Sequence, residues 1–384
     1  MRPALLLVLT TSLLCGQEAR LNALLKDMLI FDAHIDTPRY FLDEGYKLAE
    51  RHTYYELDLP RLREGRVGAV LFGIFAQPQD FQPFEWLPRS LEVLDALHEE
   101  VRRNAAQMEF AYTSEDVTRI HKSGKVAALA SLEGGHLFGD SERILRDFYR
   151  LGIRYVTLAH FRNSLYADSM TDERKHGGLS AKGRDLVREM NRMGMMVDVS
   201  HISDEAVFDA VRTSVSPVIA SHSSVKAIAP IPRNMPDEVI RAVASKGGVI
   251  CINFHAGYLN EAAYNVYIGN RPKRDAEIKA VGRNWEQVRR IQRRYYDLMP
   301  PVNVKELLRH IDYVAKLAGA DHVALGSDFD GISGMAPRGM EDVSKYPVLV
   351  RGLMDMGYND ADIRKIMGGN LVRVMRENER RAAR

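Results

Sequence analysis

The chain has 384 residues, of which 46% are hydrophobic and 27% are charged, a balance typical of a globular protein with a sizeable core. The formal net charge is only +2 and no long basic stripe occurs, which argues against a nucleic-acid-binding protein. The short basic cluster Arg289–Arg294 is interpreted as a solvated helix face.

Residues 1–16 are predicted to be an export signal, with a buried N-terminal helix as the alternative. Arg2 supplies a small positive start, Ala4–Leu14 is apolar, and polar residues begin at Gln17. The apolar run is too short to cross a bilayer, which takes about 20 residues, and no second stretch is long enough, so no transmembrane span is expected. We expect residues 17–384 to form a single domain that is periplasmic or secreted.

Only two cysteines are present, Cys15 and Cys251. A lipoprotein anchor on Cys15 is disfavoured because Leu14 stands where a small residue is expected before a lipidated cysteine. If the signal is cut after Cys15, one thiol remains and no internal disulfide can form. Cys251 lies in the apolar run Gly248–Phe254 and is expected in the core.

Short apolar runs alternate with longer amphipathic stretches, which predicts alternating strands and helices. The predicted strands are Met28–Ala33, Val67–Ile74, Val126–Leu132, Tyr155–Leu158, Met195–Val199, Val218–Ala220, Val249–Asn253 and Val323–Gly326. The predicted helices are Leu91–Ala106, Ser141–Leu151, Lys182–Met193, Asp204–Ser214, Asp237–Lys246 and Val304–Ala318. This order favours an α/β fold of the (β/α)8 TIM-barrel type. The stretch from Asn260 to Pro301 is longer than a usual barrel connection, and we interpret it as a helical insertion.

Histidines and acidic residues fall where the predicted strands end. His34 and Asp36 follow the first strand two positions apart, so their side chains point to the same side. The others are Glu133, His201, His222 and Asp328. The C-terminal ends of barrel strands converge on one mouth, where active sites lie. Three imidazoles and three carboxylates suit a pair of ions such as zinc, and a carboxylate with two oxygens can bridge two ions.

The sequence around these residues resembles that of the membrane (renal) dipeptidases and their bacterial relatives, over roughly Leu29 to Val374. The motifs are Leu-Glu-Gly-Gly-His-Leu from Leu132, Leu-Gly-Ile-Arg-Tyr-Val-Thr-Leu-Ala-His ending at His160, Asp-Val-Ser-His ending at His201, Pro-Arg-Asn-Met-Pro-Asp from Pro232, Gly-Ser-Asp-Phe-Asp-Gly from Gly326, and Gly-Gly-Asn-Leu from Gly368. The resemblance implies a zinc dipeptidase on a TIM barrel of the metal-dependent hydrolase type.

The resemblance also implies a ligand set for two Zn2+ ions. His34 and Asp36 would hold one ion, and His201 and His222 would hold the other. Glu133 would bridge them. Two ions can lower the pKa of a shared water towards neutrality, which agrees with hydrolysis.

The substrate implied by the resemblance is a small dipeptide with a free carboxylate. His160 would bind the substrate and stabilise the oxyanion, while Arg233 offers a planar fork for the carboxylate. Asp328 would take the proton of the water and pass it to the leaving amine. Asp198 either orients a metal ligand or is structural, and Asp330 is interpreted as structural.

Two other kinds of function fit the same fold. Other TIM-barrel binuclear amidohydrolases and lactonases often begin with His-x-His and bridge their ions with a lysine. Here the pair is His34-x-Asp36, and no lysine ends a predicted strand. A non-catalytic protein on the same fold would have lost a ligand, and none is missing. The sequence leaves open the preferred dipeptide, the tolerance for D-residues, the native metal and the oligomeric state, a homodimer included.

Overall fold

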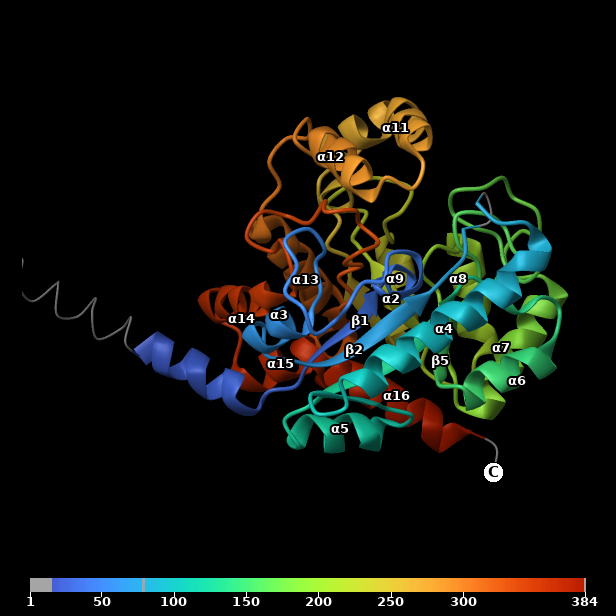
Figure 1. Ribbon diagram of the computed structural model, residues 1–384. Coiled ribbons are helices and arrows are strands. Elements are labelled where there is room, and N and C mark those ends of the chain that lie inside the picture. Colours follow the sequence, from blue (N-terminus) through green and yellow to red (C-terminus); the bar gives the residue numbers. More distant parts are fainter. Residues whose placement is uncertain (1–15, 78–79, 383–384) are drawn as a thin grey trace, which may run out of the picture.

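A closed ring of parallel strands forms the centre of the fold (Figure 1). Within the described residues, eight strands follow the order β2-β1-β9-β8-β7-β6-β5-β4, and the pairing of β2 with β4 closes the ring. Their bounds are β1 Ile30–Ile35, β2 Val67–Ile74, β4 Val126–Glu133, β5 Ile153–Thr157, β6 Met196–Asp198, β7 Ile219–Ser223, β8 Val249–Ile252 and β9 Val323–Leu325. The predicted (β/α)8 barrel is therefore confirmed. A short additional strand, β3 (Met108–Phe110), pairs with the start of β4 and was not predicted.

The computed structural model describes residues 16–77 and 80–382. The apolar run and Cys15 of the expected export signal lie outside these residues. In the part of the chain that is described, no helix combines the length and the apolar character needed to cross a membrane.

The strands are buried on both faces, as parallel barrel strands are. Successive side chains point to opposite faces, so alternate residues divide into two apolar clusters. Phe31, Ala33 and Cys251 belong to the cluster that takes residues from each strand of the ring and fills its interior. Ile30 and Val70 belong to the larger cluster between the strands and the surrounding helices. Cys251 is fully buried and unpaired.

Helices surround the ring, and the six that were predicted are all present within a few residues of their expected bounds. They are α4 Trp86–Arg103, α6 Glu142–Arg150, α7 Ala181–Met193, α8 Asp204–Thr213, α9 Asp237–Ser245 and α13 Val304–Ala318. Helices that were not predicted are α2 Pro38–Asp43, α3 Leu59–Glu64, α5 Ser114–Lys122, α10 Ala256–Leu259, α14 Tyr346–Asp355, α15 Asp360–Arg364 and α16 Asn370–Arg381. Helix α16 covers one end of the ring, because its Leu371 and Val374 join the interior cluster (Figure 1).

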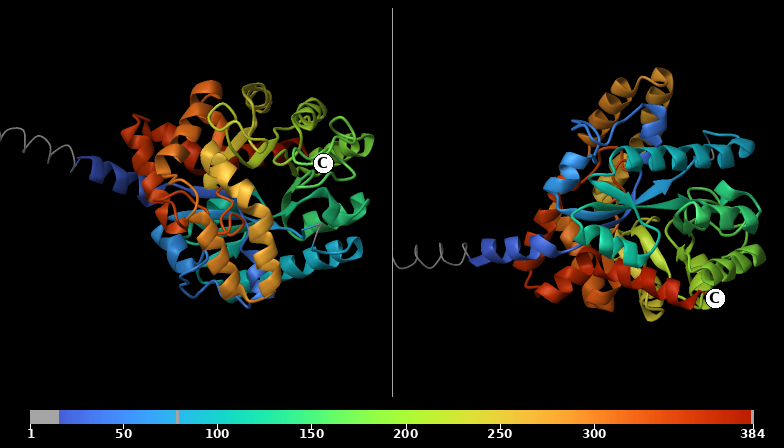
Figure 2. Two further views of the ribbon diagram at one scale, coloured as in Figure 1. Left: turned by 90° about the horizontal axis from the view of Figure 1, so that it is seen from above. Right: turned by 60° about the horizontal axis from the view of Figure 1, so that its bottom comes forward.

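The long stretch after β8 forms two helices, α11 (Glu261–Val281) and α12 (Trp285–Tyr296). They stand above the ring at the end opposite α16 (Figure 1), and seen from above they lie across it (Figure 2). The name "lid" is used below for α11 and α12 together.

Candidate active site

The ends of four strands bring the five predicted metal ligands together. Oε1 of Glu133 lies 3.3 Å from Nε2 of both His201 and His222. It lies 3.6 Å from Nε2 of His34, which is itself 3.2 Å from Oδ1 of Asp36. All five side chains are buried. Residues more than a hundred positions apart therefore share one small volume.

The chemistry of this cluster fits metal ions. Nε2 of His34 and Oδ1 of Asp36 are buried without a hydrogen-bond partner, and leaving such an atom unpaired costs about 1–3 kcal/mol. Nε2 of His201 and Nε2 of His222 lie only 2.7 Å apart, so both nitrogens are directed at the same place, where one ion could bind them. Burial holds the pKa of both imidazoles well below 6.5, so each keeps a lone pair for a cation at neutral pH. Neutral imidazoles and carboxylates are the ligand types that zinc accepts.

Glycines keep the space around the ligands open. A Cβ on Gly73 of β2 would collide with Oδ1 of Asp36 and with the His34 ring. Gly134, directly after Glu133, has a φ of 126°, which side-chain-bearing residues rarely adopt. Glycine at position 73 therefore leaves room for two of the ligands, and glycine at position 134 permits the turn that follows Glu133.

Two of the histidines are oriented from behind. Nδ1 of His34 lies 2.5 Å from the Tyr155 hydroxyl, and Nδ1 of His222 lies 2.8 Å from the Ser221 hydroxyl. Ser221 in turn donates to Oδ2 of Asp198 over 2.7 Å. With Nδ1 as the donor, Nε2 of each ring points its lone pair at the cluster. This chain of contacts favours the orienting role for Asp198, whereas Tyr155 and Ser221 carried no signal in the sequence.

Asp328 lies beside the cluster on the segment after β9. Its Oδ2 accepts a hydrogen bond of 2.9 Å from the Asn253 amide. Burial and the neighbouring Asp36 carboxylate raise the pKa of Asp328 to about 7. A carboxyl group that titrates near neutrality is suited to accept and return a proton. One oxygen of Asp328 also lies within 4.8 Å of donor atoms of His34 and Asp36.

The two predicted substrate-binding residues lie on the same mouth. Nε2 of His160 is 3.3 Å from Oε1 of Glu133, and burial holds the His160 pKa well below 6.5. Arg233 donates to the His222 carbonyl over 2.6 Å and to the Ser223 hydroxyl over 3.1 Å, while its Nε is buried and unpartnered. All eight predicted site residues therefore converge.

Asp330, which was interpreted as structural, lies behind the site. It is buried, and its Oδ1 accepts from the Glu56 backbone N–H over 2.7 Å. Its Oδ2 accepts from the Thr37 hydroxyl over 2.5 Å. These bonds tie the segment that carries Asp328 to the segment that follows Asp36.

A cavity of about 760 Å³ opens above the cluster, and the lid forms part of its wall. Its lid residues are Tyr267, Arg271, Arg274, Asp275, Ile278, Lys279, Trp285 and Gln292. The guanidinium of Arg274 lies 4.6 Å from the centre of the Tyr267 ring, and that ring is 4.8 Å from His255. His255 stacks on Tyr258 at 4.3 Å, and Tyr258 lies 5.7 Å from the Arg233 guanidinium. A row of ring contacts, edge-on from Tyr267 to His255 and stacked from His255 to Tyr258, thus connects the lid to the expected carboxylate site.

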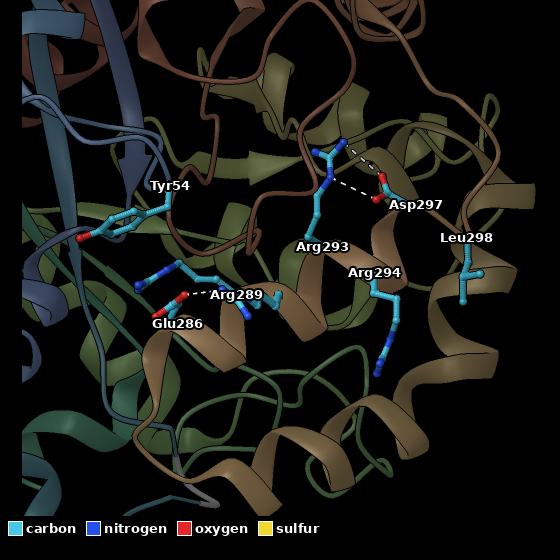
Figure 3. A pocket seen from close by; sticks show the side chains of 8 residues that line it. Tyr54, Glu286, Arg289, Arg293, Arg294, Asp297 and Leu298 are labelled. Atoms are coloured by element: carbon cyan, nitrogen blue, oxygen red, sulfur yellow. Dashed lines mark hydrogen bonds and ion pairs between the residues drawn. The ribbon is translucent and has the colours of Figure 1, made fainter.

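A second cavity, of about 900 Å³, lies outside this mouth against α12 (Figure 3). It contains the basic cluster, but the guanidinium groups there have carboxylate partners. Arg290 lies 2.6 Å from Glu286, and Arg293 lies 3.1 Å from Asp297. These exposed ion pairs agree with a solvated helix face.

The model of the membrane dipeptidase family (peptidase family M19) matches residues 18–384. The chain belongs to this family. It is 39% identical to Dipeptidase tcpJ of Claviceps purpurea over 335 residues, which cover 85% of this chain and 70% of that protein. It is 33% identical to Dipeptidase verJ of Clonostachys rogersoniana over 367 residues, covering 92% and 84%. The probable dipeptidase PvdM from Pseudomonas aeruginosa superposes with a TM-score of 0.84 at 27% identity, covering 96% of this chain and 99% of that one.

Membership in the membrane dipeptidase family confirms the resemblance drawn from the sequence motifs. It identifies the chain as a dipeptidase and favours this function over the other amidohydrolases and lactonases that were weighed. The buried donors at the mouth of this dipeptidase are accordingly its candidate metal site.

Proposed function

We propose that this chain hydrolyses dipeptides with a free C-terminal carboxylate, using two Zn2+ ions. The observation that carries the proposal is the buried cluster around Glu133, with unpartnered atoms on His34 and Asp36. His34 and Asp36 would hold one ion, His201 and His222 the other, and Glu133 would bridge them. Bound there, two ions would lower the pKa of a water and polarise the scissile carbonyl.

The remaining residues would handle the proton and the substrate. Asp328, held by Asn253, would accept the proton of the attacking water and deliver it to the leaving amine as the C–N bond breaks. His160 would donate a hydrogen bond to the developing oxyanion. Arg233 would pair with the substrate carboxylate through the N–H groups that its protein partners leave free. Such an anchor favours cleavage of the bond next to a C-terminal residue over cleavage of internal peptide bonds.

We extend the proposal to L,D-dipeptides, because a carboxylate held by Arg233 does not by itself select the configuration of the neighbouring Cα. The cavity above the cluster, about 760 Å³, leaves room for side chains on either side. A panel of L,L and L,D pairs of the same composition measures this preference directly.

The test combines metal analysis with this panel on the purified protein. We expect about two zinc ions per chain, from the two-metal template. We also expect efficient cleavage of free dipeptides and poor cleavage of their C-terminal amides. One ion or none in fully active enzyme would contradict the two-metal proposal. Equal turnover of free and amidated dipeptides would contradict the carboxylate anchor.

A further inference from the structure

Two arginines at the mouth form no ion pair with a carboxylate among the described residues. Arg39 lines the active-site cavity, and the guanidinium of Arg233 lies 5.7 Å from the ring of Tyr258, which lines it too. The cavity's lid arginines differ, because Arg271 and Arg274 lie 3.5 Å and 2.9 Å from oxygens of Asp275. If Arg233 takes the main-chain carboxylate, a dipeptide with neutral side chains leaves Arg39 unused. A second unpaired guanidinium at the same mouth therefore needs an explanation.

Arg39 lies in α2, just after β1, and is half-buried. Its Nη2 donates to the Tyr40 hydroxyl over 2.5 Å and to the Asp330 carbonyl over 3.2 Å. Its Nε is buried and has no partner. The guanidinium lies 5.2 Å from the centre of the Phe75 ring, and that ring is 6.3 Å from His160. Arg39 is thus held beside the reacting centre with N–H groups to spare.

The strand order places Arg39 and Arg233 on different sides of the mouth. Arg233 follows β7, whereas Arg39 follows β1 and packs on Phe75, which comes directly after β2. In the closed ring, β2 lies opposite β7, because four steps separate them in either direction. The cluster around Glu133 lies between. A dipeptide whose carboxylate is at Arg233 and whose carbonyl is above the cluster therefore extends its amino-terminal residue towards Arg39.

We propose that Arg39 forms a subsite for the side-chain carboxylate of an acidic amino-terminal residue. This inference rests on the proposed function, since it uses the carboxylate anchor at Arg233. A planar guanidinium with free N–H groups beside an aromatic face, partly shielded from water, favours a carboxylate over a neutral amide. The enzyme should prefer Asp or Glu at the amino-terminal position of its dipeptide.

The carboxylates that act on Arg39 are those of Asp36, Asp330 and Asp80, and Asp36 and Asp80 line the same cavity. Among the described residues, none of them lies within ion-pair distance of the guanidinium. Burial raises the pKa of Asp80, and the nearby Arg39 offsets this only in part. The Arg39 guanidinium therefore keeps its buried Nε without a partner, although three carboxylates lie near it.

The experiment compares kcat/KM for Glu-Ala with Gln-Ala, and for Ala-Glu with Ala-Gln, using the zinc-loaded enzyme. We expect Glu-Ala to exceed Gln-Ala by roughly 10- to 100-fold, the size of a charge-assisted hydrogen-bonded pair. The Ala-Glu to Ala-Gln ratio should be much closer to one. Arg39→Met should bring the Glu-Ala to Gln-Ala ratio near one, and Arg39→Lys should restore part of it.

The matched control is Arg271→Met, which removes a guanidinium that lines the same cavity but already has Asp275 as its partner. It should keep the native ratio. A purely structural role of Arg39 would lower both rates together and leave the ratio unchanged, which would overturn the subsite. Equal rates for Glu-Ala and Gln-Ala in the native enzyme, or a preference seen only with Ala-Glu, would also overturn it. Hydrolysis of neither pair nor of any other dipeptide would overturn the proposed function itself.

Discussion

The mouth of the barrel and the lid above it differ in how their polar side chains are paired. At the mouth, Nε2 of His34 and Oδ1 of Asp36 are buried and lie 3.2 Å apart, but neither atom makes a hydrogen bond. On the lid, Arg290 is 77% exposed and lies 2.6 Å from Glu286, and Arg294 pairs with Glu277. An unpaired polar atom is inexpensive in water but costly in the interior, so its retention at the mouth points to a ligand. The exposed pairs of the lid need no such explanation.

This difference predicts where substitutions should matter. Changes at the mouth should alter chemistry, changes to buried but fully bonded groups should alter stability, and changes to the exposed pairs of the lid should alter little. The four predictions below follow this order, from the largest expected effect to the smallest.

The largest effect is expected at Asp328. Asp328→Asn should leave both metals bound and lower kcat by about 10²–10⁴-fold, because the amide cannot accept the proton. Glu133→Gln should differ, since a weaker bridge should release metal as well as activity. Metal content and kcat measured together on both variants separate the two roles. If Asp328→Asn loses metal while Glu133→Gln retains it, the assignments of base and bridge are wrong.

A smaller loss is expected at Arg233. Arg233→Ala should weaken the use of free dipeptides by about 1.5–3 kcal/mol in kcat/KM, because a charge-assisted pair with the substrate carboxylate is lost. C-terminally amidated dipeptides serve as the control, since they lack that charge and should be affected much less. A similar loss on both kinds of substrate would show that Arg233 acts on the fold of the mouth instead.

The third prediction concerns Asp168, a buried carboxylate whose two oxygens both accept hydrogen bonds from backbone N–H groups. Burial alone would raise its pKa, but the N–H groups of His176, Gly178 and Lys175 hold the pKa below 3.8. A pKa lowered by folding adds stability that is fully present above about pH 3.8 and is lost as the pH falls through the folded-state value. Asp168→Asn should therefore cost about 1–3 kcal/mol at neutral pH.

The measurement for Asp168 is denaturant unfolding of the native and variant proteins across the acid range. The difference in unfolding free energy should be constant near neutrality and shrink below about pH 3.8. A difference that stays the same throughout that range would mean that the charge of the Asp168 carboxylate is not what stabilises the segment 168–178.

The smallest effect is expected on the lid. Glu277→Gln removes the charged partner of Arg294 but keeps an amide oxygen that can accept from the Tyr295 hydroxyl. It should change the unfolding free energy by less than about 1 kcal/mol, because an ion pair open to water is screened. Glu286→Gln is the matched variant for the neighbouring pair with Arg290. Thermal unfolding of both measures the effect. A loss of several kcal/mol in either would mean that the lid depends on its ion pairs.

The sequence predicted much of the framework because its signals are local. The eight barrel strands are short buried runs bounded by polar residues, and His34, Glu133 and Asp328 could be placed at or just after strand ends without any tertiary information. Helices α14 to α16 were not predicted although they are well formed, and β3 has only three residues. A strand that short carries no readable period, and its pairing with β4 is made at a distance.

The sequence by itself determined the barrel, the family and the set of candidate metal ligands, because the spacing of apolar residues and of motifs is a local property of the chain. The tertiary structure alone decided how those donors are supported. The contact between His34 and Tyr155 spans 121 positions, and the bond from Asn253 to Asp328 spans 75. That Arg39 lacks a carboxylate partner among the described residues is likewise invisible in sequence, because long-range pairing depends on which segments folding brings within reach. The pair of Arg271 with Asp275 differs, since its spacing of four residues on one helix can be read from the sequence. Such contacts arise only when the closure of the ring through β2 and β4 fixes the distances across the mouth.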